Sequence, residues 1–528
     1  PILRRDRRDG VLVIVLATMV VLGVVGPQLK RVYPFTYDEL TYLRKTRAYD
    51  HWRREAGVQA RAGNTLWVFS RAAVSQAEML RDMHPGFVKL VGLVPHWLTL
   101  LTLHKEGGAR LTGALFLALA VASLYWFLAP RTGRSLAFLG ALGFGLLPRL
   151  FGHAHFHALD VPAMAMIFVA ACASRRAATR GTWGAALVGG VLCGIALATK
   201  LNAIALLPHL VLWLLLFRPV GWKKMLVSGL VLAPLVFFCL WPWLWHDLPD
   251  KLSGYIAFHA QHFKVGTLYL GRVYGGATTA PISYPPVMLA VSVPLAWLAL
   301  LCIGVKGVAR RGDEREAFLW LGLLTNLGLT MLPNAARYGG ARLAMPAIIF
   351  AAALALLAAH RLGLRVAQSG LARRAWPWVV GTILVATSLV GIVATYPYCL
   401  SYYSPLIGGP RGTQRLGLEM TYWGDAFYGA AETMSDPANS AAQFYASNEL
   451  ATGVLDALIR ANMVPPQHRL LGRFIEDYIP ADADWVIVDN SPPMWSAATA
   501  QLVRTRRPDV TVARQGVPLL WLYHLLDE

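Results

Sequence analysis

Acidic side chains are scarce in this sequence, and three of them stand where a carboxylate could do chemistry. Asp38 and Glu39 follow the first long apolar run, and Asp160 stands at the mouth of a later one. A carboxylate held just above hydrocarbon is partly desolvated, which raises its basicity and suits it to act as a general base. The alternative is helix capping, because Asp at a helix start accepts backbone N–H bonds. All three are candidate catalytic residues, although capping is favoured for Glu39 taken alone.

Three histidines precede Asp160 at alternate positions, namely His153, His155 and His157. In an extended segment this spacing could supply three metal ligands, whereas in a hydrated loop it supplies polar contacts. We favour contacts to a substrate or to a neighbouring segment, with His157 as a candidate binding residue. The sequence predicts no cofactor. The alternative is a divalent cation held by these histidines and the carboxylates.

Basic side chains at the ends of apolar runs could hold a phosphate group. Lys89 could bind one particular phosphate or, alternatively, reach lipid phosphates from an apolar helix. Lys200 separates two apolar runs, and Arg337 and Arg342 lie in one loop. Since Arg is suited to bidentate phosphate binding, these cations together predict a phosphate site.

The composition shows what kind of protein must position these residues. Of 528 residues, 56% are hydrophobic and only 15% are charged, and the mean hydropathy is +0.47. Soluble proteins carry about 25% charged residues, so an ordinary soluble enzyme and a disordered protein are both excluded. The net charge of +20 would suggest nucleic acid in a soluble protein, but basic cytoplasmic loops of a membrane protein account for it. We therefore predict a polytopic membrane protein that contacts lipids and binds no nucleic acid.

Eleven apolar runs are long enough to cross a membrane, and each predicts a helix. They cover residues 11–29, 110–129, 135–151, 161–174, 183–199, 201–217, 225–245, 287–305, 317–332, 343–359 and 377–395. The first run lacks a small-residue cleavage site and is therefore predicted to remain as a span.

Two further segments are predicted to lie on the membrane surface. The run 86–103 contains Lys89, a proline and a histidine, which suit an interfacial helix better than a span. After Asp38, the side chains of Tyr42, Tyr49 and Trp52 fall on one helical face, which predicts a second interfacial helix.

Counts of Lys and Arg set the predicted orientation. If the run 86–103 does not cross, the inner segments hold twenty of these residues. The outer loops after residue 140 hold only Arg149, Lys200, Lys251, Lys264, Arg272, Arg337 and Arg342. The positive-inside rule then puts the N-terminus in the cytoplasm and the tail outside. The candidate site residues consequently fall on the outer side.

The predicted architecture is an all-α membrane domain, residues 1–395, followed by a soluble extracytoplasmic domain, residues 396–528. The tail is more polar than the rest of the chain. Alternating or continuous apolar patterns predict strands at 485–489, 510–513 and 518–523 and a helix at 451–463, so a small α/β domain is expected.

The order and sidedness of the motifs resemble the GT-C superfamily of glycosyltransferases. Short motifs occur in the family's order: Tyr37-Asp-Glu39, His84-Pro followed by Lys89, Leu159-Asp160 and Thr199-Lys200. The segments 396–410 and 422–425 are similar to the stretch that follows the membrane domain in many bacterial members. The chain looks like the protein O-mannosyltransferase branch and its bacterial relatives, which include lipid A aminoarabinose transferases. Gly86 stands where the family usually has proline.

The resemblance implies a GT-C fold and a glycosyltransferase that takes a hexose or pentose from a polyprenyl-phosphate donor. Transfer would occur at the outer face of the inner (plasma) membrane, to a hydroxyl or phosphate of a protein, lipid or envelope glycan. The resemblance makes Asp38 the base and lets Asp160 orient the acceptor or the sugar. The residues it implies for the donor phosphate and the sugar are Lys89, Lys200, Arg337, Arg342, His84 and Tyr269, with the loop 246–286 covering the donor.

A secondary transporter, or a flippase for lipid-linked sugars, is the alternative function. A transporter should carry charged residues near the bilayer midplane and should show paired broken helices. The candidate charges here cluster at the outer face, and no paired halves are visible in the sequence. We therefore favour the transferase.

Overall fold

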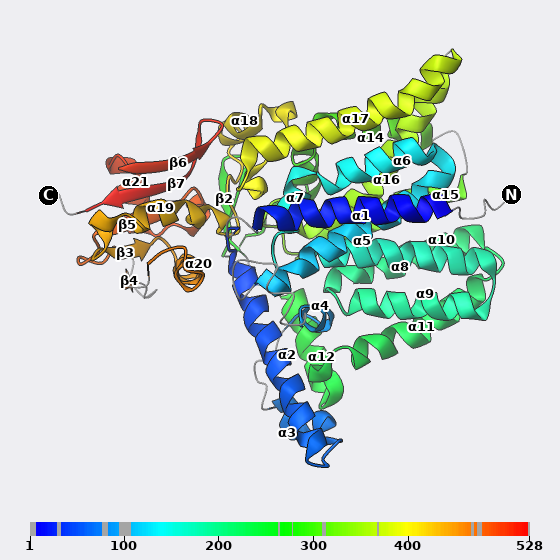
Figure 1. Cartoon of the computed structure of the whole chain (residues 1–528), viewed down its shortest axis with the longest axis horizontal. Helices are drawn as coiled ribbons and strands as arrows, with labels where there is room; N and C mark the ends of the chain where they lie inside the picture. Colours follow the sequence, from blue (N-terminus) through cyan, green and yellow to red (C-terminus); the bar gives the residue numbers. More distant parts are fainter. Residues whose placement is uncertain are drawn as a thin grey trace.

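The computed structural model describes residues 7–28, 33–75, 83–93, 107–261, 265–276, 278–308, 313–366, 369–465, 469–471 and 478–525. Most of the chain is a bundle of helices that run side by side, with the N-terminus at one end and the C-terminal domain at the other (Figure 1). The bundle contains α1 (Arg7–Gln28), α5 (Gly107–Thr132), α6 (Arg134–Gly145), α8 (Asp160–Arg180), α9 (Trp183–Leu197), α10 (Leu206–Phe217), α11 (Trp222–Cys239), α14 (Leu295–Val308), α15 (Glu314–Met331), α16 (Met345–Val366) and α17 (Gly370–Thr395). Each of the eleven predicted runs therefore contains a helix. Among the described residues, six helices are long and apolar enough to cross a membrane: α1, α5, α8, α11, α16 and α17.

Several predicted runs are interrupted where a proline follows. The run 135–151 is divided between α6 and the short α7 (Pro148–His153), and the run 287–305 between α13 (Tyr284–Val291) and α14. Proline has no N–H to donate and is well suited to the first turn of a helix, so it starts a new helix more easily than it continues one. These two predicted spans are therefore shorter in the structure than the apolar runs that predict them.

Helix α16 forms the centre of the bundle, where every residue from Met345 to Ala359 is buried. Helices α5, α8, α14 and α15 pack around it. Small residues allow helices to approach closely in a membrane, where apolar burial alone gives them little reason to associate. Between α9 and α11, for example, a side chain at Gly190 would overlap the backbone carbonyl of Ser228.

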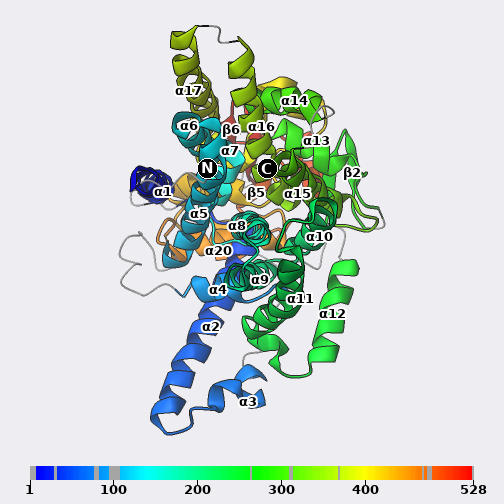
Figure 2. The ribbon, with the colours of Figure 1, turned by 90° about the vertical axis from the view of Figure 1, so that its right-hand side faces the viewer.

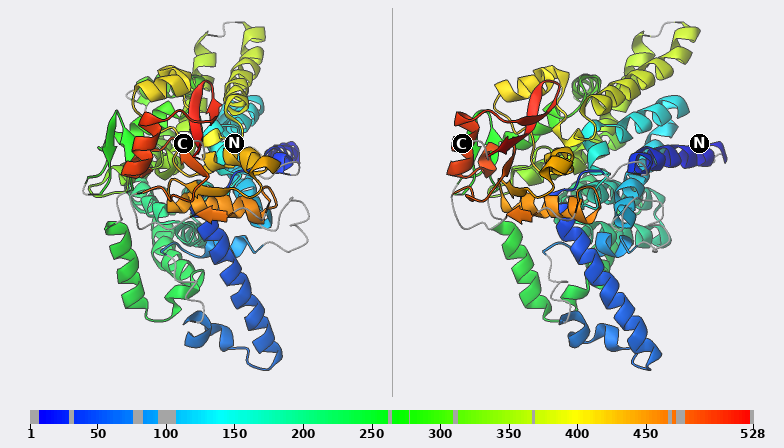
Figure 3. Two further views of the ribbon diagram at one scale, coloured as in Figure 1. Left: turned by 90° about the vertical axis from the view of Figure 1, so that its left-hand side faces the viewer. Right: turned by 60° about the vertical axis from the view of Figure 1, so that its left-hand side comes forward.

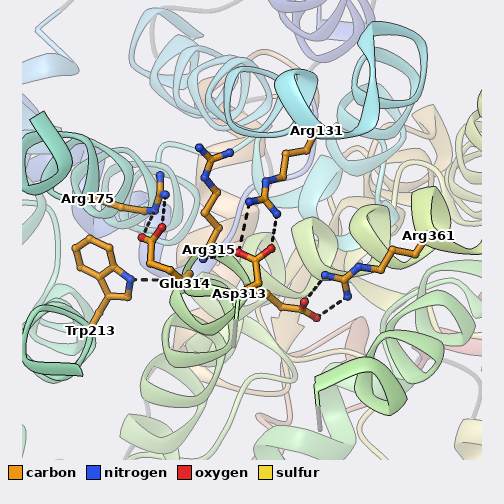
Figure 4. A network of polar contacts seen from close by, with 8 residues as sticks. Arg131, Arg175, Trp213, Asp313, Glu314, Arg315 and Arg361 are labelled. Carbon is orange, nitrogen blue, oxygen red and sulfur yellow. Dashed lines mark hydrogen bonds and ion pairs between the residues drawn. The ribbon is translucent and has the colours of Figure 1, made fainter. Parts of the chain in front are cut away.

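Ion pairs fix the start of α15 at the end of the bundle remote from the C-terminal domain (Figures 1 and 4). Three helices of the core supply one arginine each, and the pairs are Asp313–Arg131 (2.5 Å), Glu314–Arg175 (2.8 Å) and Glu316–Arg361. The arginines come from α5, α8 and α16, and Arg131, Arg175 and Arg361 are among the twenty Lys and Arg residues that the sequence places on the inner side. The network therefore joins four helices at one end of the bundle.

Helices α2 (Tyr37–Arg61) and α12 (Leu248–Ala260) slant away from the direction of the spans (Figures 1 and 2). The first is the helix predicted after Asp38, but Tyr42 and Tyr49 are buried against the protein rather than turned outward. A short α3 (Arg71–Ser75) follows it. Of the predicted surface helix 86–103, only α4 (Phe87–Val91) is described, and residues 94–106 lie outside the described residues.

The C-terminal domain, drawn in orange and red in Figure 3, contains a sheet. This sheet has five strands in the order β4-β3-β5-β7-β6. Its elements are β3 (Gln443–Ala446), β4 (Arg469–Leu471), β5 (Trp485–Asp489), β6 (Val510–Arg514), β7 (Val517–His524) and helices α18 (Gly409–Arg415), α19 (Ala431–Met434), α20 (Glu449–Arg460) and α21 (Ala497–Thr505). β3 runs parallel to β4 and β5, whereas β5, β7 and β6 are antiparallel neighbours. The small α/β domain is thus confirmed, and β3 and β4 are too short for the sequence pattern to predict.

The loop 246–286 carries α12 and a hairpin of β1 (Thr267–Tyr269) and β2 (Arg272–Tyr274), neither of which the sequence predicts. Leu270 and Gly271 have φ of 50° and 75° at the hairpin turn, as a tight turn between antiparallel strands requires. The N–H of Gly271 donates to the carbonyl of Gly417 at 2.9 Å. This loop is therefore attached to the tail.

Candidate active site

A cavity of about 300 Å³ lies where α2, α12, the end of α15 and the segment 334–343 meet. Its apolar wall includes Leu201, Leu329, Leu332 and Leu343. Its polar lining includes Asp38, Tyr42, His84, Lys200, Asn202, His259, Tyr338 and Arg342. The charged members stand at helix starts and helix ends close to the C-terminal domain, so the cavity belongs to one end of the bundle rather than to its middle (Figure 1).

Two acid–cation pairs stand at this cavity. Asp38 Oδ2 lies 2.5 Å from Arg342 Nη1, and Asp160 Oδ1 lies 2.6 Å from Lys200 Nζ. The side chain of Asp38 is 39% exposed, whereas that of Asp160 is 4% exposed. Asp38 is therefore the carboxylate that an entering substrate can reach, and Asp160 is the carboxylate that fixes Lys200.

Helix capping does not account for either aspartate. The N-cap of α2 is Thr36 and that of α8 is Leu159, and neither makes a side-chain capping bond. Asp38 and Asp160 lie inside the first turns instead, where negative charge is favourable next to the helix N-terminus. Their side chains are directed to cations on other segments.

Arg342 is also held by aromatic rings. Its guanidinium lies 4.7 Å from the centre of the Trp423 ring and 5.3 Å from that of Tyr338. The backbone carbonyl of Trp423 accepts the N–H of Tyr37 at 3.1 Å. A single tail residue therefore contacts Arg342 and the residue that precedes Asp38.

Glu39 does not face the cavity. Its carboxylate accepts from Arg110 Nε at 2.8 Å and from Arg110 Nη2 at 2.7 Å, and both side chains are almost wholly buried. The N–H of His157 donates to the same carboxylate at 2.8 Å, and Arg110 also donates to the carbonyls of Tyr33 and Pro34. Neither catalysis at the cavity nor capping describes this arrangement, which ties α2 to α5 and to the segment before α8.

The three histidines are buried and do not converge on one point. His157 shares hydrogen bonds with Thr46 at 2.8 Å and with Thr112 at 2.9 Å. His155 bonds the carbonyl of Phe151, and His153 shares a bond with the hydroxyl of Tyr422 at 3.1 Å. Burial lowers the pKa of each imidazole to about 3, so all three are neutral at physiological pH. Within the part of the chain that the structure describes, no three His, Cys, Asp or Glu side chains gather as metal ligands.

Three of the residues predicted to bind the donor do not line the cavity. Lys89 is buried and donates to the carbonyls of His84 at 2.8 Å and Pro85 at 3.1 Å. Arg337 donates to carbonyls that include those of Ala280 and Leu332, and it lines an adjoining cavity of about 230 Å³. Tyr269 is buried and shares a hydrogen bond with Ser283 at 3.1 Å. Of the predicted set, the structure brings His84, Lys200 and Arg342 to the cavity.

The structure adds residues that sequence reasoning misses. His259 reaches the cavity from α12, and Asn202 and Tyr338 also line it. Asn202 and Tyr338 stand close to Lys200 and Arg342 in sequence, so proximity to a candidate cation could have indicated them. His259 carries no such signal, because α12 lies within a loop that has no motif.

Comparisons with known proteins find one family and several solved structures that are similar to this chain. The family described as dolichyl-phosphate-mannose-protein mannosyltransferase matches residues 90–246. The apo crystal structure of ArnT from Cupriavidus metallidurans matches with a TM-score of 0.52 at 14% identity, over 98% of both chains. An oligosaccharyltransferase of Archaeoglobus fulgidus matches with a TM-score of 0.46 at 10% identity, over 90% of this chain and 68% of that one. No curated protein matches the sequence.

The likeness to ArnT shows a shared fold over nearly the whole chain. The family match covers the segment that contains Asp160 and Lys200. The predicted resemblance to GT-C glycosyltransferases of the protein mannosyltransferase and aminoarabinose transferase kind is therefore confirmed. The chain is thus a multi-pass membrane protein that has the fold of ArnT and resembles the mannosyltransferase family over residues 90–246.

Proposed function

We propose that this protein is an inner-membrane glycosyltransferase that moves a sugar from a polyprenyl-phosphate donor to a hydroxyl or phosphate on a protein, lipid or envelope glycan. The observation that carries the proposal is the half-exposed carboxylate of Asp38 beside Arg342 and Lys200 on one cavity. ArnT from Cupriavidus metallidurans, whose fold this chain shares, has also been crystallised with undecaprenyl phosphate.

The proposed reaction divides the work between the carboxylate and the cations. Asp38 takes the proton of the acceptor hydroxyl, and the acceptor oxygen forms a bond to the anomeric carbon of the sugar. The bond between that carbon and the phosphate oxygen breaks, and the polyprenyl phosphate leaves with the electron pair. Arg342 and Lys200 line the cavity and stabilise the negative charge of the departing phosphate. Asp160 holds Lys200 in place for this purpose.

The position of the charges argues against the transporter alternative. Asp160 is the first residue of α8, Lys200 follows the end of α9, and Arg342 precedes α16. A transport site lies near the bilayer midplane, within broken helices. The two ion pairs lie instead at the end of the bundle that carries the C-terminal domain (Figure 1).

Transfer of labelled sugar tests the proposal directly. Purified protein is incubated with a panel of polyprenyl-phosphate sugars and with envelope extracts, and products are identified by mass spectrometry. Appearance of a glycosylated acceptor together with free polyprenyl phosphate is the expected result. If no donor in the panel is consumed, while donors move between the leaflets of vesicles that contain the protein, the flippase alternative is correct instead.

We also propose that the N-terminus is cytoplasmic and that the C-terminal domain lies outside the cytoplasm. The uneven distribution of Lys and Arg supports this orientation. A reporter that is active only in the cytoplasm should be silent when fused after Glu528. The same reporter placed between α5 and α6 should be active. The reversed pattern would contradict the orientation.

Transfer is proposed to need no divalent cation. A cation bound to Asp38 would lower its basicity, and Arg342 and Lys200 already supply positive charge to the leaving phosphate. Activity should therefore survive EDTA treatment followed by dialysis, within about twofold of the untreated enzyme. Loss of activity that Mg²⁺, Mn²⁺ or Zn²⁺ restores would make the metal part of the mechanism.

A further inference from the structure

Glu419 is a buried carboxyl group in the tail segment that follows α18, and it does not line the cavity. Its side chain is 2% exposed, and burial raises its pKa to about 8. The hydroxyl of Tyr284 donates to Glu419 Oε2 at 3.2 Å, and the hydroxyl of Tyr403 donates to the backbone carbonyl of Glu419. Since buried polar groups are costly unless they are paired, these bonds fix where the carboxyl group lies.

Tyr284 extends this contact to the loop that carries Arg342. The N–H of Gly340 donates to the Tyr284 hydroxyl at 2.8 Å. Gly339 and Gly340 have φ of 67° and 64°, a backbone conformation that favours glycine. A side chain at Gly340 would also overlap Arg149 Nη1. The loop therefore has one close-fitting conformation, and Arg342 follows Gly340 by two residues.

Arg149 encloses the other side of this loop. Its guanidinium lies 4.4 Å from the centre of the Tyr403 ring and 5.5 Å from that of Tyr422, and its Nε donates to the carbonyl of Tyr402 at 2.9 Å. The charged and titratable groups that act on Glu419 from the surrounding elements are Tyr284 of α13, Arg149 of α7 and Arg342. Tyr403 of the tail lies against the same group.

We propose that Glu419 and Tyr284 are positioning residues that hold the loop 339–342, so that Arg342 meets Asp38. The hydrogen-bonded chain runs from Glu419 through the Tyr284 hydroxyl to the Gly340 amide. Trp423 adds a second contact from the same tail segment, through its ring to Arg342 and its carbonyl to Tyr37. The tail thus helps to position Arg342 in the site. This inference rests on the proposed function for the roles of Asp38 and Arg342.

The kinetic test uses Tyr284→Phe, which removes the hydroxyl and keeps the ring. We expect kcat per folded molecule to fall about tenfold, with KM for the donor changed less than about twofold, because small misplacements of a catalytic group are costly. Tyr398→Phe is the matched control, since Tyr398 is a buried tail tyrosine outside the cavity and the Glu419 chain. It should leave kcat unchanged. A Tyr284→Phe enzyme with lower folded yield but normal kcat would overturn the inference.

The pH profile separates positioning from simple packing. Below about pH 8 Glu419 keeps its proton and is neutral, and above that pH it places a negative charge near Arg149 and Arg342. Wild-type kcat should therefore decline above pH 8. Glu419→Gln keeps an acceptor for Tyr284 and cannot ionise, so it should retain near-normal kcat at pH 7 and lose the alkaline decline. An unchanged profile in this variant would contradict the role given to Glu419.

Hydrogen–deuterium exchange tests the link without any transfer assay. Peptides that contain Gly340 should exchange faster in Tyr284→Phe than in the wild type, and those of Tyr398→Phe should not. If the wild type transfers no sugar, the proposed function fails while this measurement still decides whether the link exists. If transfer occurs but neither exchange nor kcat changes in Tyr284→Phe, the positioning inference alone fails.

Discussion

Replacement of Asp38 by Asn is expected to reduce sugar transfer at least about 100-fold, with near-normal expression and folding. Asn has nearly the volume of Asp and can still accept a hydrogen bond from Arg342, but it cannot take the acceptor's proton. Arg342 is only 5% exposed, so the variant must be compared at equal amounts of folded protein, although Asp38 itself is 39% exposed and water can reach its position. The measurement is kcat with a saturating lipid-linked donor, normalised to folded protein.

Asp50→Asn is the matched control for this variant. Asp50 lies on the same helix and forms surface ion pairs with Arg53 and Arg54, away from the cavity. Its replacement should change activity less than about twofold, because exposed ion pairs contribute little. Near-normal turnover by Asp38→Asn would show that Asp38 only pairs with Arg342 and that another group is the general base.

The sequence predicts much of this site because charge is expensive next to hydrocarbon. Asp160, Lys200 and Arg342 stand at the ends of apolar runs and Asp38 follows one at a short distance, and an ionised side chain there is tolerated only if it has a partner or a function. Consecutive spans alternate in direction. The start of α8, the end of α9 and the start of α16 must therefore lie at the same end of the bundle. Their pairing into Asp38–Arg342 and Asp160–Lys200 is a matter of side-chain geometry, which the sequence does not encode in any short pattern.

Neighbouring residues on a helix can have opposite roles for the same reason. Asp38 and Glu39 are adjacent, and successive side chains of an α-helix point about 100° apart. One therefore faces the cavity while the other faces Arg110, which is 71 residues away in the chain. Lys89 is a similar case. Its partners are the carbonyls of its own helix start, and no charge pattern distinguishes that arrangement from a phosphate site.

The tail was predictable as an α/β domain, but its part in the site was not. Continuous apolar runs such as 485–489 predict a buried strand, and the structure has one there. The contacts made by Glu419 and Trp423 depend on two glycines with positive φ and on a tyrosine from α13. Three segments from distant parts of the chain meet there, and single-sequence patterns report only local structure.

Breaking the buried pair of Glu39 and Arg110 should destabilise the protein more than any single surface change. Glu39→Gln leaves a buried guanidinium without its countercharge, which costs about 3–5 kcal/mol when one partner of a buried pair is removed. The Arg110 side chain is 1% exposed and cannot turn to water without unpacking the start of α5. The apparent midpoint of thermal unfolding in detergent should therefore drop by roughly 3–5 °C.

Glu314→Gln provides the comparison, because Glu314 also pairs with an arginine of a neighbouring helix but is 32% exposed (Figure 4). Glu314→Gln should lower the free energy of unfolding by about 1 kcal/mol or less, since water replaces the lost partner.

Folded Glu39→Gln protein should keep most of its transfer activity, because Glu39 does not line the cavity. A stable but inactive Glu39→Gln enzyme would show that Glu39 takes part in catalysis and that the buried pair opens during turnover.

A double variant, Glu39→Leu with Arg110→Met, should recover part of the lost stability, because it removes both buried charges. The recovery is only partial, because the carbonyls of Tyr33 and Pro34 lose the hydrogen bonds that Arg110 donates.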